Sequence, residues 1–132
     1  MADLPQVNAQ QINKMKLIAG SEADRPVFML NLNCYTAEAD YPNGALYKNY
    51  MGILDKLLSE VGGKILWRTN IEGTVVGEQC IHEALGIWYP SHASFMALMT
   101  APSSEENMKL RAKAVFHADL HRCADYTNQG QS

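Results

Sequence analysis

Apolar and polar residues alternate with a period of two in one stretch near the start of the chain. Residues 26–33 read Pro-Val-Phe-Met-Leu-Asn-Leu-Asn, which is typical of a strand because successive side chains on a strand point to opposite faces. Asn31 and Asn33 share one face with smaller apolar neighbours. The opposite face carries three large apolar side chains, Phe28, Leu30 and Leu32. We expect the rest of the chain to cover this second face.

The remaining pattern alternates between helical and strand periods, with glycine and proline at the boundaries. Residues 47–61 place apolar side chains at helical spacing, and two glycines follow, as is common just past a helix end. Asn8, Ser91 and Ser104 precede or begin other helical stretches. In chain order the predicted elements are a helix at 8–20, strand 26–33, helix 47–61, strands 64–76 and 81–89, a helix after Ser91, helix 104–114 and strand 115–126.

Apart from the first helix, this order is strand, helix, strand, strand, helix, strand. It predicts an α+β fold of the ferredoxin-like βαββαβ type, with the first strand between the third and the fourth. We expect an N-terminal helix and connector at 1–25, one ferredoxin-like domain at 26–126 and a polar tail at 127–132. The helices should cover the face of Phe28, and the face of Asn31 should lack a cover within the chain. An uncovered sheet face favours a homodimer.

Composition excludes several classes of partner. The chain has 132 residues and a formal net charge of −3, without the clustered Lys and Arg that a nucleic acid requires. No apolar run approaches the ~18 residues of a membrane span, and the first residues lack the pattern of a signal peptide. The three cysteines are odd in number and widely spaced, so we expect no disulfide framework and a reducing cytoplasmic location.

Four segments carry a resemblance to a known family. They are the strand around Asn31, the run Val-Gly-Gly-Lys-Ile-Leu-Trp-Arg at 61–68, Val-Gly-Glu at 76–78, and Tyr-Pro-Ser at 89–91 with Phe95. Together they make the chain resemble the DUF1330 family of the dimeric α/β-barrel superfamily. The resemblance implies a dimeric α/β barrel with a small pocket in each subunit. The superfamily includes cofactor-free monooxygenases, isomerases and lyases, so the resemblance does not select one reaction.

The last predicted strand carries the most prominent titratable residues. Alternation places His117, Asp119 and His121 on one face, which we expect beside Asn31. A histidine held by an aspartate is a candidate general acid or base, and the amide of Asn31 is a candidate donor to a developing oxyanion. The same three side chains have a spacing that suits a metal ion. Alternatively, this strand lies at the sheet edge and its polar face is only hydrated.

Further residues are candidates for binding a ligand. Arg68 would hold a carboxylate if it faces the pocket, although it would otherwise be a surface arginine. Tyr47 and Tyr50 lie on nearly the same side of their helix and either reach the pocket or only pack. Gly86 would leave room for a ligand on the sheet. The other candidates are Asn33, Trp67, His82 and Trp88, with Glu83 replacing His82 and Trp88 in the alternative register of that strand.

The resulting functional hypothesis is a cytoplasmic homodimer that binds a small organic, potentially anionic, molecule and catalyses acid–base chemistry without a cofactor. A glycine-rich phosphate loop and a dinucleotide fingerprint are both missing from the sequence, so we expect no cofactor. Two alternatives remain open. One is a binding or scaffolding dimer without a reaction, and the other is a metal-dependent enzyme that uses His117, Asp119 and His121.

Overall fold

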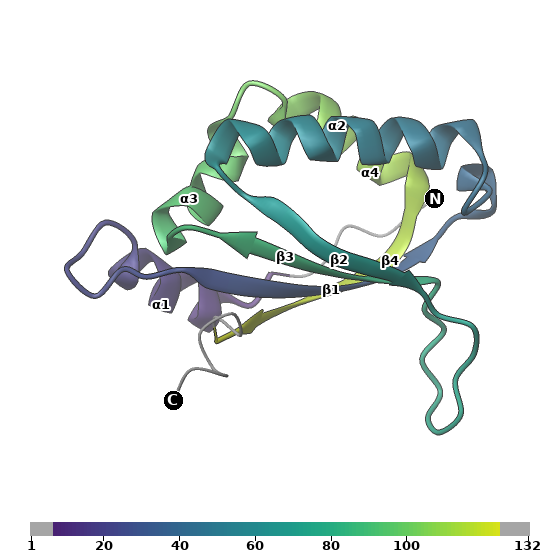
Figure 1. The fold of residues 1–132 in the computed structure, drawn as a ribbon, viewed down its shortest axis with the longest axis horizontal. Coiled ribbons are helices and arrows are strands. Elements are labelled where there is room, and N and C mark those ends of the chain that lie inside the picture. The colour runs from purple at the N-terminus through teal and green to yellow at the C-terminus, as the bar shows by residue number, and fades with distance from the viewer. Residues whose placement is uncertain (1–6, 125–132) are drawn as a thin grey trace.

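The computed structural model of the chain describes residues 7–124 and has a four-stranded antiparallel sheet with helices on one face (Figure 1). The strand order is β2-β3-β1-β4, so the first strand is central, as predicted. This is the ferredoxin-like α+β fold. The helices are α1 (Ala9–Ile18), α2 (Ala45–Val61), α3 (His92–Met96) and α4 (Ser104–Ala114), and the strands are β1 (Val27–Tyr35), β2 (Lys64–Asn70), β3 (Glu83–Tyr89) and β4 (Val115–Cys123).

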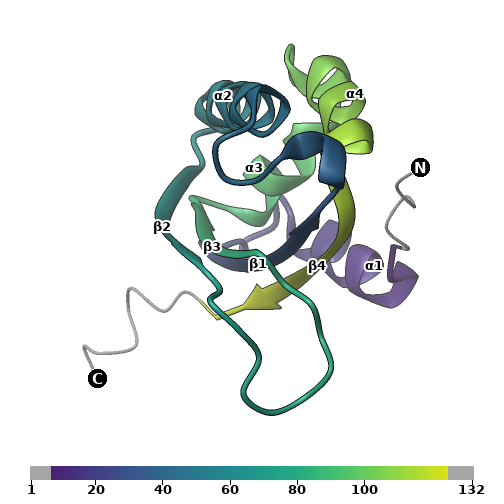
Figure 2. The same ribbon diagram turned by 90° about the vertical axis from the view of Figure 1, so that its right-hand side faces the viewer.

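The two long helices α2 and α4 cover the same face of the sheet, as the view along the strands shows (Figure 2). α2 ends at Gly62, whose φ of 80° is a left-handed conformation that glycine adopts without strain. Two 3-10 turns, η1 (Ala37–Ala39) and η2 (Ala97–Thr100), complete the connections. Within the described residues, no helix has the length and apolar character needed to cross a membrane.

The covered face of β1 is the opposite of the one that the sequence pattern predicts. Val27, Met29 and Tyr35 belong to the buried core beneath the helices, and Asn33 is buried on the same face. Phe28, Leu30 and Leu32 therefore lie on the open face. The prediction was wrong because both faces of β1 carry apolar side chains, and a strand pattern of this kind does not say which face the helices cover.

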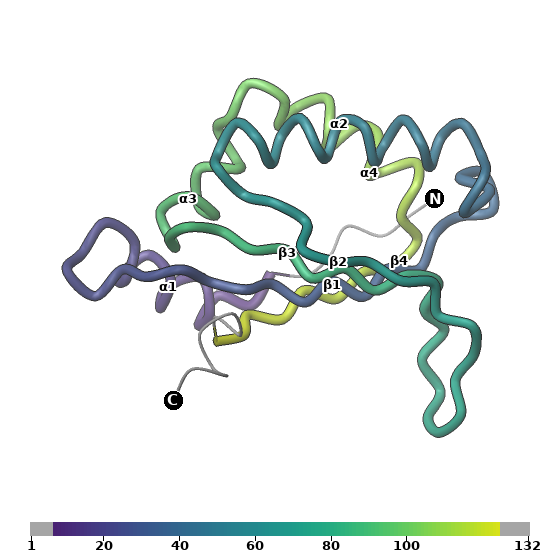
Figure 3. The backbone as a smooth tube through the Cα atoms, in the orientation of Figure 1, coloured from purple at the N-terminus to yellow at the C-terminus, as the bar shows by residue number. Residues whose placement is uncertain are grey.

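Three predicted boundaries also differ. β2 ends at Asn70 and β3 begins at Glu83, so residues 71–82 form an irregular segment between them. This segment projects away from the helices (Figure 3), and Val75 within it is 97% exposed. The glycines in the segment and the lack of neighbouring chain explain why strand pairing stops there. The helix after Ser91 is short and continues as η2, and the predicted end of the last strand at 126 lies outside the described residues.

Candidate functional site

A buried carboxylate lies where the sheet meets α2. Glu83 begins β3 and is only 3% exposed, although its neighbours along the same face of the strand are apolar. The hydroxyl of Tyr35, at the end of β1, donates to Glu83 Oε1 at 2.6 Å. The hydroxyl of Tyr47, on α2, lies 3.0 Å from Oε1 and 2.9 Å from Oε2. Three elements thus converge on one carboxylate, and each supplies a side chain to it.

The Glu83 carboxylate receives its hydrogen bonds from neutral donors. The nearest cation is Arg68 of β2, whose Nε lies 3.9 Å from Glu83 Oε2 and whose side chain is 46% exposed. Burial and the bond to Glu83 raise the pKa of the Tyr35 hydroxyl, and the same two causes raise that of Tyr47. Both hydroxyls therefore remain protonated donors at neutral pH. Asn33 completes the group, since its Nδ2 donates to the Tyr35 hydroxyl at 3.1 Å.

Aromatic rings form one wall of the site. Tyr41 stacks on Tyr35 with ring centroids 4.9 Å apart and meets Tyr47 edge-on at 4.7 Å. The His82 ring lies nearly parallel to that of Tyr35, at 6.2 Å, and its Nδ1 accepts a hydrogen bond from the Tyr35 backbone N–H at 2.8 Å. The Tyr41 hydroxyl donates to Asn70 Oδ1. These contacts hold the tyrosines in fixed orientations around the carboxylate.

The convergence encloses a pocket of about 370 Å³ between the start of α2 and the facing ends of β2 and β3. Its lining includes Tyr41, Tyr47, Arg68, Asn70 and Glu83. A partly exposed guanidinium at the rim and a buried carboxylate, with Arg68 Nε 3.9 Å from Glu83 Oε2, give the pocket charges of both signs. Such a pocket can hold the anionic end of a small molecule at Arg68 while the carboxylate contacts another atom of it.

The structure brings together about half of the predicted binding residues. Asn33, Tyr47 and Arg68 meet at Glu83, and His82 packs against the aromatic wall. Tyr50 is buried in the core instead. Burial raises the pKa of its hydroxyl and outweighs the neighbouring Arg111, which lowers it. Asn31 lies on the covered face, but its Nδ2 donates to the Met29 carbonyl at 3.1 Å rather than into the pocket.

Trp67, Trp88 and Gly86 lie on the open face of the sheet. Trp67 pairs with Gly86 across β2 and β3. A Cβ on Gly86 would lie 2.5 Å from atoms of Phe28 and Trp67, so these two rings fill the space that the sequence suggested was left for a ligand. The Trp88 ring is contacted by Lys64, with Nζ 5.2 Å from its centroid. The expectation of a ligand above Gly86 was therefore wrong.

The predicted His/Asp/His group is also separated from the asparagines. In the register of β1 and β4, His117 is opposite Cys34, Asp119 opposite Leu32 and His121 opposite Leu30. Directly paired residues share a face, so all three lie on the open face. The expected placement beside Asn31 and Asn33 was wrong, because the strand pairing aligns the His/Asp/His group with the even-numbered residues of β1, which face away from the two asparagines. His117 Nε2 lies 3.4 Å from Asp119 Oδ1, and the His117 side chain is 58% exposed.

Sequence reasoning missed Tyr35 and Tyr41, and it named Glu83 only as the alternative to His82, Gly86 and Trp88 in the other register of β3. The sequence carries one signal for Glu83, a single charged residue that continues the apolar alternation of Leu85, Ile87 and Tyr89. A carboxylate in line with core side chains requires buried partners. The tyrosines carry no such signal, because their meeting depends on strand register and on the path of the chain between β1 and α2.

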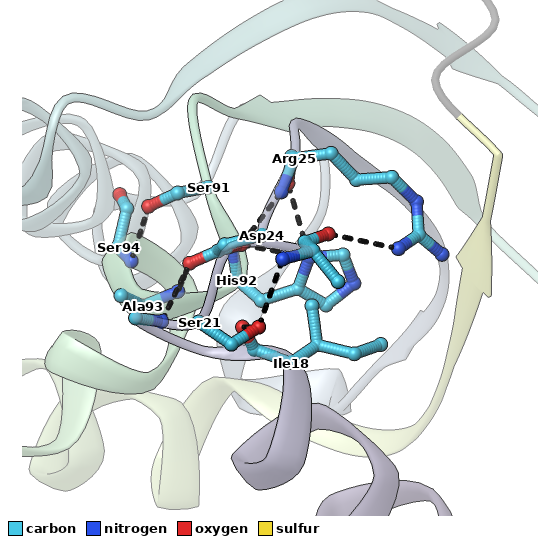
Figure 4. Close-up of polar contacts among 10 residues, drawn as sticks. Ile18, Ser21, Asp24, Arg25, Ser91, His92, Ala93 and Ser94 are labelled. Atoms are coloured by element: carbon cyan, nitrogen blue, oxygen red, sulfur yellow. Dashed lines mark hydrogen bonds and ion pairs between the residues drawn. The ribbon is translucent and has the colours of Figure 1, made fainter.

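A second polar cluster joins the connector before β1 to the start of α3 (Figure 4). The Asp24 carboxylate accepts hydrogen bonds from the backbone N–H groups of His92 at 2.7 Å and Ala93 at 3.2 Å, and from those of Gly20 and Arg25. Burial raises the pKa of this carboxyl, but the four N–H donors outweigh burial and hold the pKa well below its ordinary value. The buried His92 ring contacts the Arg25 carbonyl through Nδ1. This cluster fastens the connector to α3.

Comparison with known proteins supports the fold and no activity. Neither a protein-family model nor a curated protein matches the chain. Two solved structures resemble it, those of RPA0582, a protein of unknown function from Rhodopseudomonas palustris, and of the methylated RPA0582 protein. The first is 24% identical, covers 89% of this chain and 93% of its own, and gives a TM-score of 0.71. The second is 24% identical, with 93% and 95% covered and a TM-score of 0.72.

Proposed function

We propose that the chain binds a small organic anion in the Glu83 pocket and that Glu83 acts as a base on it without a cofactor. The observation that carries the proposal is a buried carboxylate at the base of a pocket whose rim holds the cation of Arg68. A carboxylate within hydrogen-bond reach of a bound ligand can take a proton from it, and carboxylates act as general bases in enzymes.

The geometry assigns roles to individual atoms. Oε1 of Glu83 receives the Tyr35 hydroxyl and the longer bond from Tyr47, so Oε2 is the oxygen with more capacity to accept a proton. A ligand anion at Arg68 would place a neighbouring C–H group over Oε2. The proton moves from carbon to Oε2, and the electron pair remains on the ligand, where conjugation with its carbonyl group spreads the charge. Isomerases, lyases and cofactor-free monooxygenases that form a carbanion share this first step.

Exchange of C–H protons in heavy water tests this step without knowledge of the physiological substrate. We expect the protein to catalyse deuterium incorporation next to the carbonyl of some members of a panel of small α-keto acids, followed by NMR. Glu83→Gln should abolish the exchange. Asp119→Asn, an equally conservative change of a carboxylate on the open face, is the matched control and should retain it. Equal exchange by Glu83→Gln and the parent chain would contradict the proposal.

A non-catalytic binding or scaffolding protein is the second candidate. It is favoured by the two tyrosine hydroxyls that already bond Glu83, since a carboxylate bonded in this way can serve only to join β1, β3 and α2. This function predicts that Glu83→Gln changes the free energy of unfolding and that no panel member exchanges protons above the buffer rate. Chemical denaturation and the exchange assay on the same samples distinguish the two candidates.

We also propose that two copies pair through their open faces to form the dimeric α/β barrel that the resemblance to DUF1330 implies. Support comes from the aromatic side chains on this face, among which Trp67 is 38% exposed. Trp67→Glu should convert a dimer to a monomer in sedimentation velocity, whereas Lys109→Glu on α4 should not. A parent chain that sediments as a monomer would contradict this. The unpaired cysteines of the described residues support a cytoplasmic location.

A metal-dependent enzyme remains the third candidate. It rests on the open-face residues His117, Asp119 and His121, of which the first two lie in contact. It predicts that the purified protein retains metal in elemental analysis and that His117→Ala together with His121→Ala removes that metal along with activity. Exchange activity that survives both changes would exclude this function.

A further inference from the structure

Two cysteines and a histidine from distant parts of the chain meet at one corner of the molecule. Cys34 is near the end of β1, and Cys80 and His82 are in the last part of the irregular segment 71–82. One ligand atom from each of the three residues lies within 4.8 Å of the others. In the part of the chain that the structure describes, this is the only group of three or more such side chains whose ligand atoms converge. We propose that it is a binding site for a thiophilic divalent metal ion, with Zn²⁺ as its occupant.

The donor set selects this class of metal. Two sulfurs and one imidazole nitrogen suit Zn²⁺, whereas Mg²⁺ and Ca²⁺ require oxygen ligands. Zinc bonds of about 2.0–2.3 Å place tetrahedral ligand atoms about 3.5–4 Å apart. The ligand atoms are within 4.8 Å of one another, and side-chain rotations that move them by about 1 Å bring them to this spacing. Cys80 is exposed and has the freedom to make that rotation.

The charge of the ion complements that of the sulfur ligands. Two thiolates side by side without a cation repel each other. A bound Zn²⁺ removes this penalty because it supplies two positive charges between the sulfurs. Binding converts two thiols to two zinc–thiolate bonds and releases two protons to solvent.

The imidazole of His82 lies at this corner with its Nδ1 lone pair already in a hydrogen bond. Its Nδ1 accepts the backbone N–H of Tyr35, the residue that directly follows Cys34, at 2.8 Å. In the neutral ring the proton then lies on Nε2, and Nδ1 is the nitrogen able to ligate a metal. The ion would replace the Tyr35 N–H at Nδ1, so the Tyr35 amide is a reporter of occupancy. The fourth position of a tetrahedral ion is left for water.

The site would fasten the segment between β2 and β3 to the end of β1. That segment projects away from the sheet and is otherwise exposed over much of its length (Figure 1). The proposal does not require the Glu83 chemistry, because neither cysteine lines the Glu83 pocket, although His82 also packs against Tyr35 and Tyr41 in the wall of that site. It also differs from the open-face metal hypothesis, which uses other side chains.

Titration of the reduced, chelator-stripped full chain tests the site, with Co²⁺ as a spectroscopic probe and Zn²⁺ as its competitor. We expect one ion per chain, thiolate-to-cobalt charge-transfer absorption, release of two protons per Zn²⁺ and a shift of the Tyr35 amide signal in NMR. Cys80→Ser should weaken binding at least about 100-fold, because even changes outside the ligand set typically cost about 10–100-fold. Cys34→Ser should do the same, and His82→Gln should weaken binding at least about tenfold.

Cys123 is the matched control, since it is the third free cysteine of the described residues. It lies on β4 opposite Phe28, on the same sheet face as Cys34 but at the other end of the strand pair. Cys123→Ser should bind Zn²⁺ as the parent chain does. Because Cys80 is exposed, Cys80→Ser should fold normally, and circular dichroism verifies this. The proposal is overturned if Cys80→Ser keeps the parent affinity, if Cys123→Ser loses it, or if the reduced parent chain binds no Zn²⁺. Because the titrated chain is reduced, absence of Zn²⁺ binding overturns the proposal even if Cys34 and Cys80 form a disulfide in air.

Discussion

The two faces of the sheet differ in whether their polar residues are buried or exposed to solvent. On the covered face, Glu83 and Asn33 are buried. Glu83 accepts a hydrogen bond from Tyr35 on the neighbouring strand β1, and Asn33 donates to the same Tyr35 hydroxyl from within β1. On the open face, His117 and Asp119 contact each other at 3.4 Å with much of the His117 side chain in solvent. Both groups arise from the same two-residue alternation of strands. They differ only in whether a helix lies above them.

This difference teaches which polar residues the protein depends on. A surface ion pair in water contributes little, because solvent screens it and both side chains lose freedom. A buried carboxylate, by contrast, either receives its hydrogen bonds or destabilises the fold. The sequence alone made His117 and Asp119 more prominent than Glu83. In the structure, Glu83 joins β1, β3 and α2, whereas Asp119 contacts His117 on its own strand and accepts an exposed hydrogen bond from Gln79 Nε2 at 3.3 Å.

Alkaline titration should give the largest effect, because it acts on the covered face as a whole. Burial and Glu83 raise the pKa of Tyr35 and Tyr47. A raised pKa contributes stability below pH ~10, the ordinary tyrosine value, and that stability falls as the pH rises above it. A tyrosine that stays protonated in the folded state but ionises in the unfolded state lowers the free energy of unfolding by up to about 1.4 kcal/mol for each pH unit in this range. We therefore expect cooperative alkaline unfolding.

Phenolate absorbance and far-UV circular dichroism, recorded together, check this. Five of the six tyrosines, all but Tyr126, lie in the described residues, and all five have raised pKa values. Most of the phenolate signal should therefore appear together with the loss of helix. Ionisation of these tyrosines near pH ~10 in a protein that remains folded would show that the covered face is open to water.

Replacement of Glu83 should give the next largest effect. Glu83→Ala leaves the hydroxyls of Tyr35 and Tyr47 without their acceptor and opens a cavity, so we expect a loss of about 2–4 kcal/mol in the free energy of unfolding. Asp119→Ala on the open face should change it by no more than about 0.5 kcal/mol. Urea denaturation of both variants measures the difference. Similar values for the two would mean that burial does not separate the faces.

Gly86→Ala tests how tightly the open face is packed. Its Cβ would lie 2.5 Å from Phe28 and Trp67 atoms, so one ring must move, and we expect a loss of about 1–3 kcal/mol. Gly52→Ala on α2 meets nothing within 4 Å and should gain about 0.5–1 kcal/mol from helix propensity. Thermal unfolding of the two variants gives opposite signs. A stabilising Gly86→Ala would show that the two rings are mobile over the glycine.

Arg68→Met should have the smallest effect on stability. The Arg68 side chain is nearly half exposed and its Nε is 3.9 Å from Glu83, so the ion pair should contribute no more than about 0.5 kcal/mol. If the pocket binds anions at its rim, the same change should weaken α-keto acid binding at least about tenfold, because a charged hydrogen bond is lost. Isothermal titration measures the affinity. Unchanged affinity would place the anion elsewhere.

Much of the architecture could be predicted from the chain. The apolar period at 47–61 and the glycines after it correctly indicate α2 and its end, and the order of elements leads to the ferredoxin-like topology. Strand alternation and helical spacing made Arg68 and Tyr47 candidates for a pocket, with a surface arginine and a packed tyrosine as the alternatives. Both line the Glu83 pocket, and their binding of a ligand stays a prediction. The face covered by the helices was not predictable from β1, because Phe28 and Met29 are equally apolar neighbours that point to opposite faces.

The order and type of the helices and strands, and how the strands connect, follow from the local sequence, although some strand ends do not. Apolar period, capping residues and glycines act over a few neighbouring residues. Tertiary structure alone decided which face of the sheet α2 and α4 cover, and therefore that Glu83 is buried and His117 is not. It also brought Cys80 to Cys34. These outcomes depend on strand register and on packing between distant segments, where one step along a strand reverses the direction of every side chain.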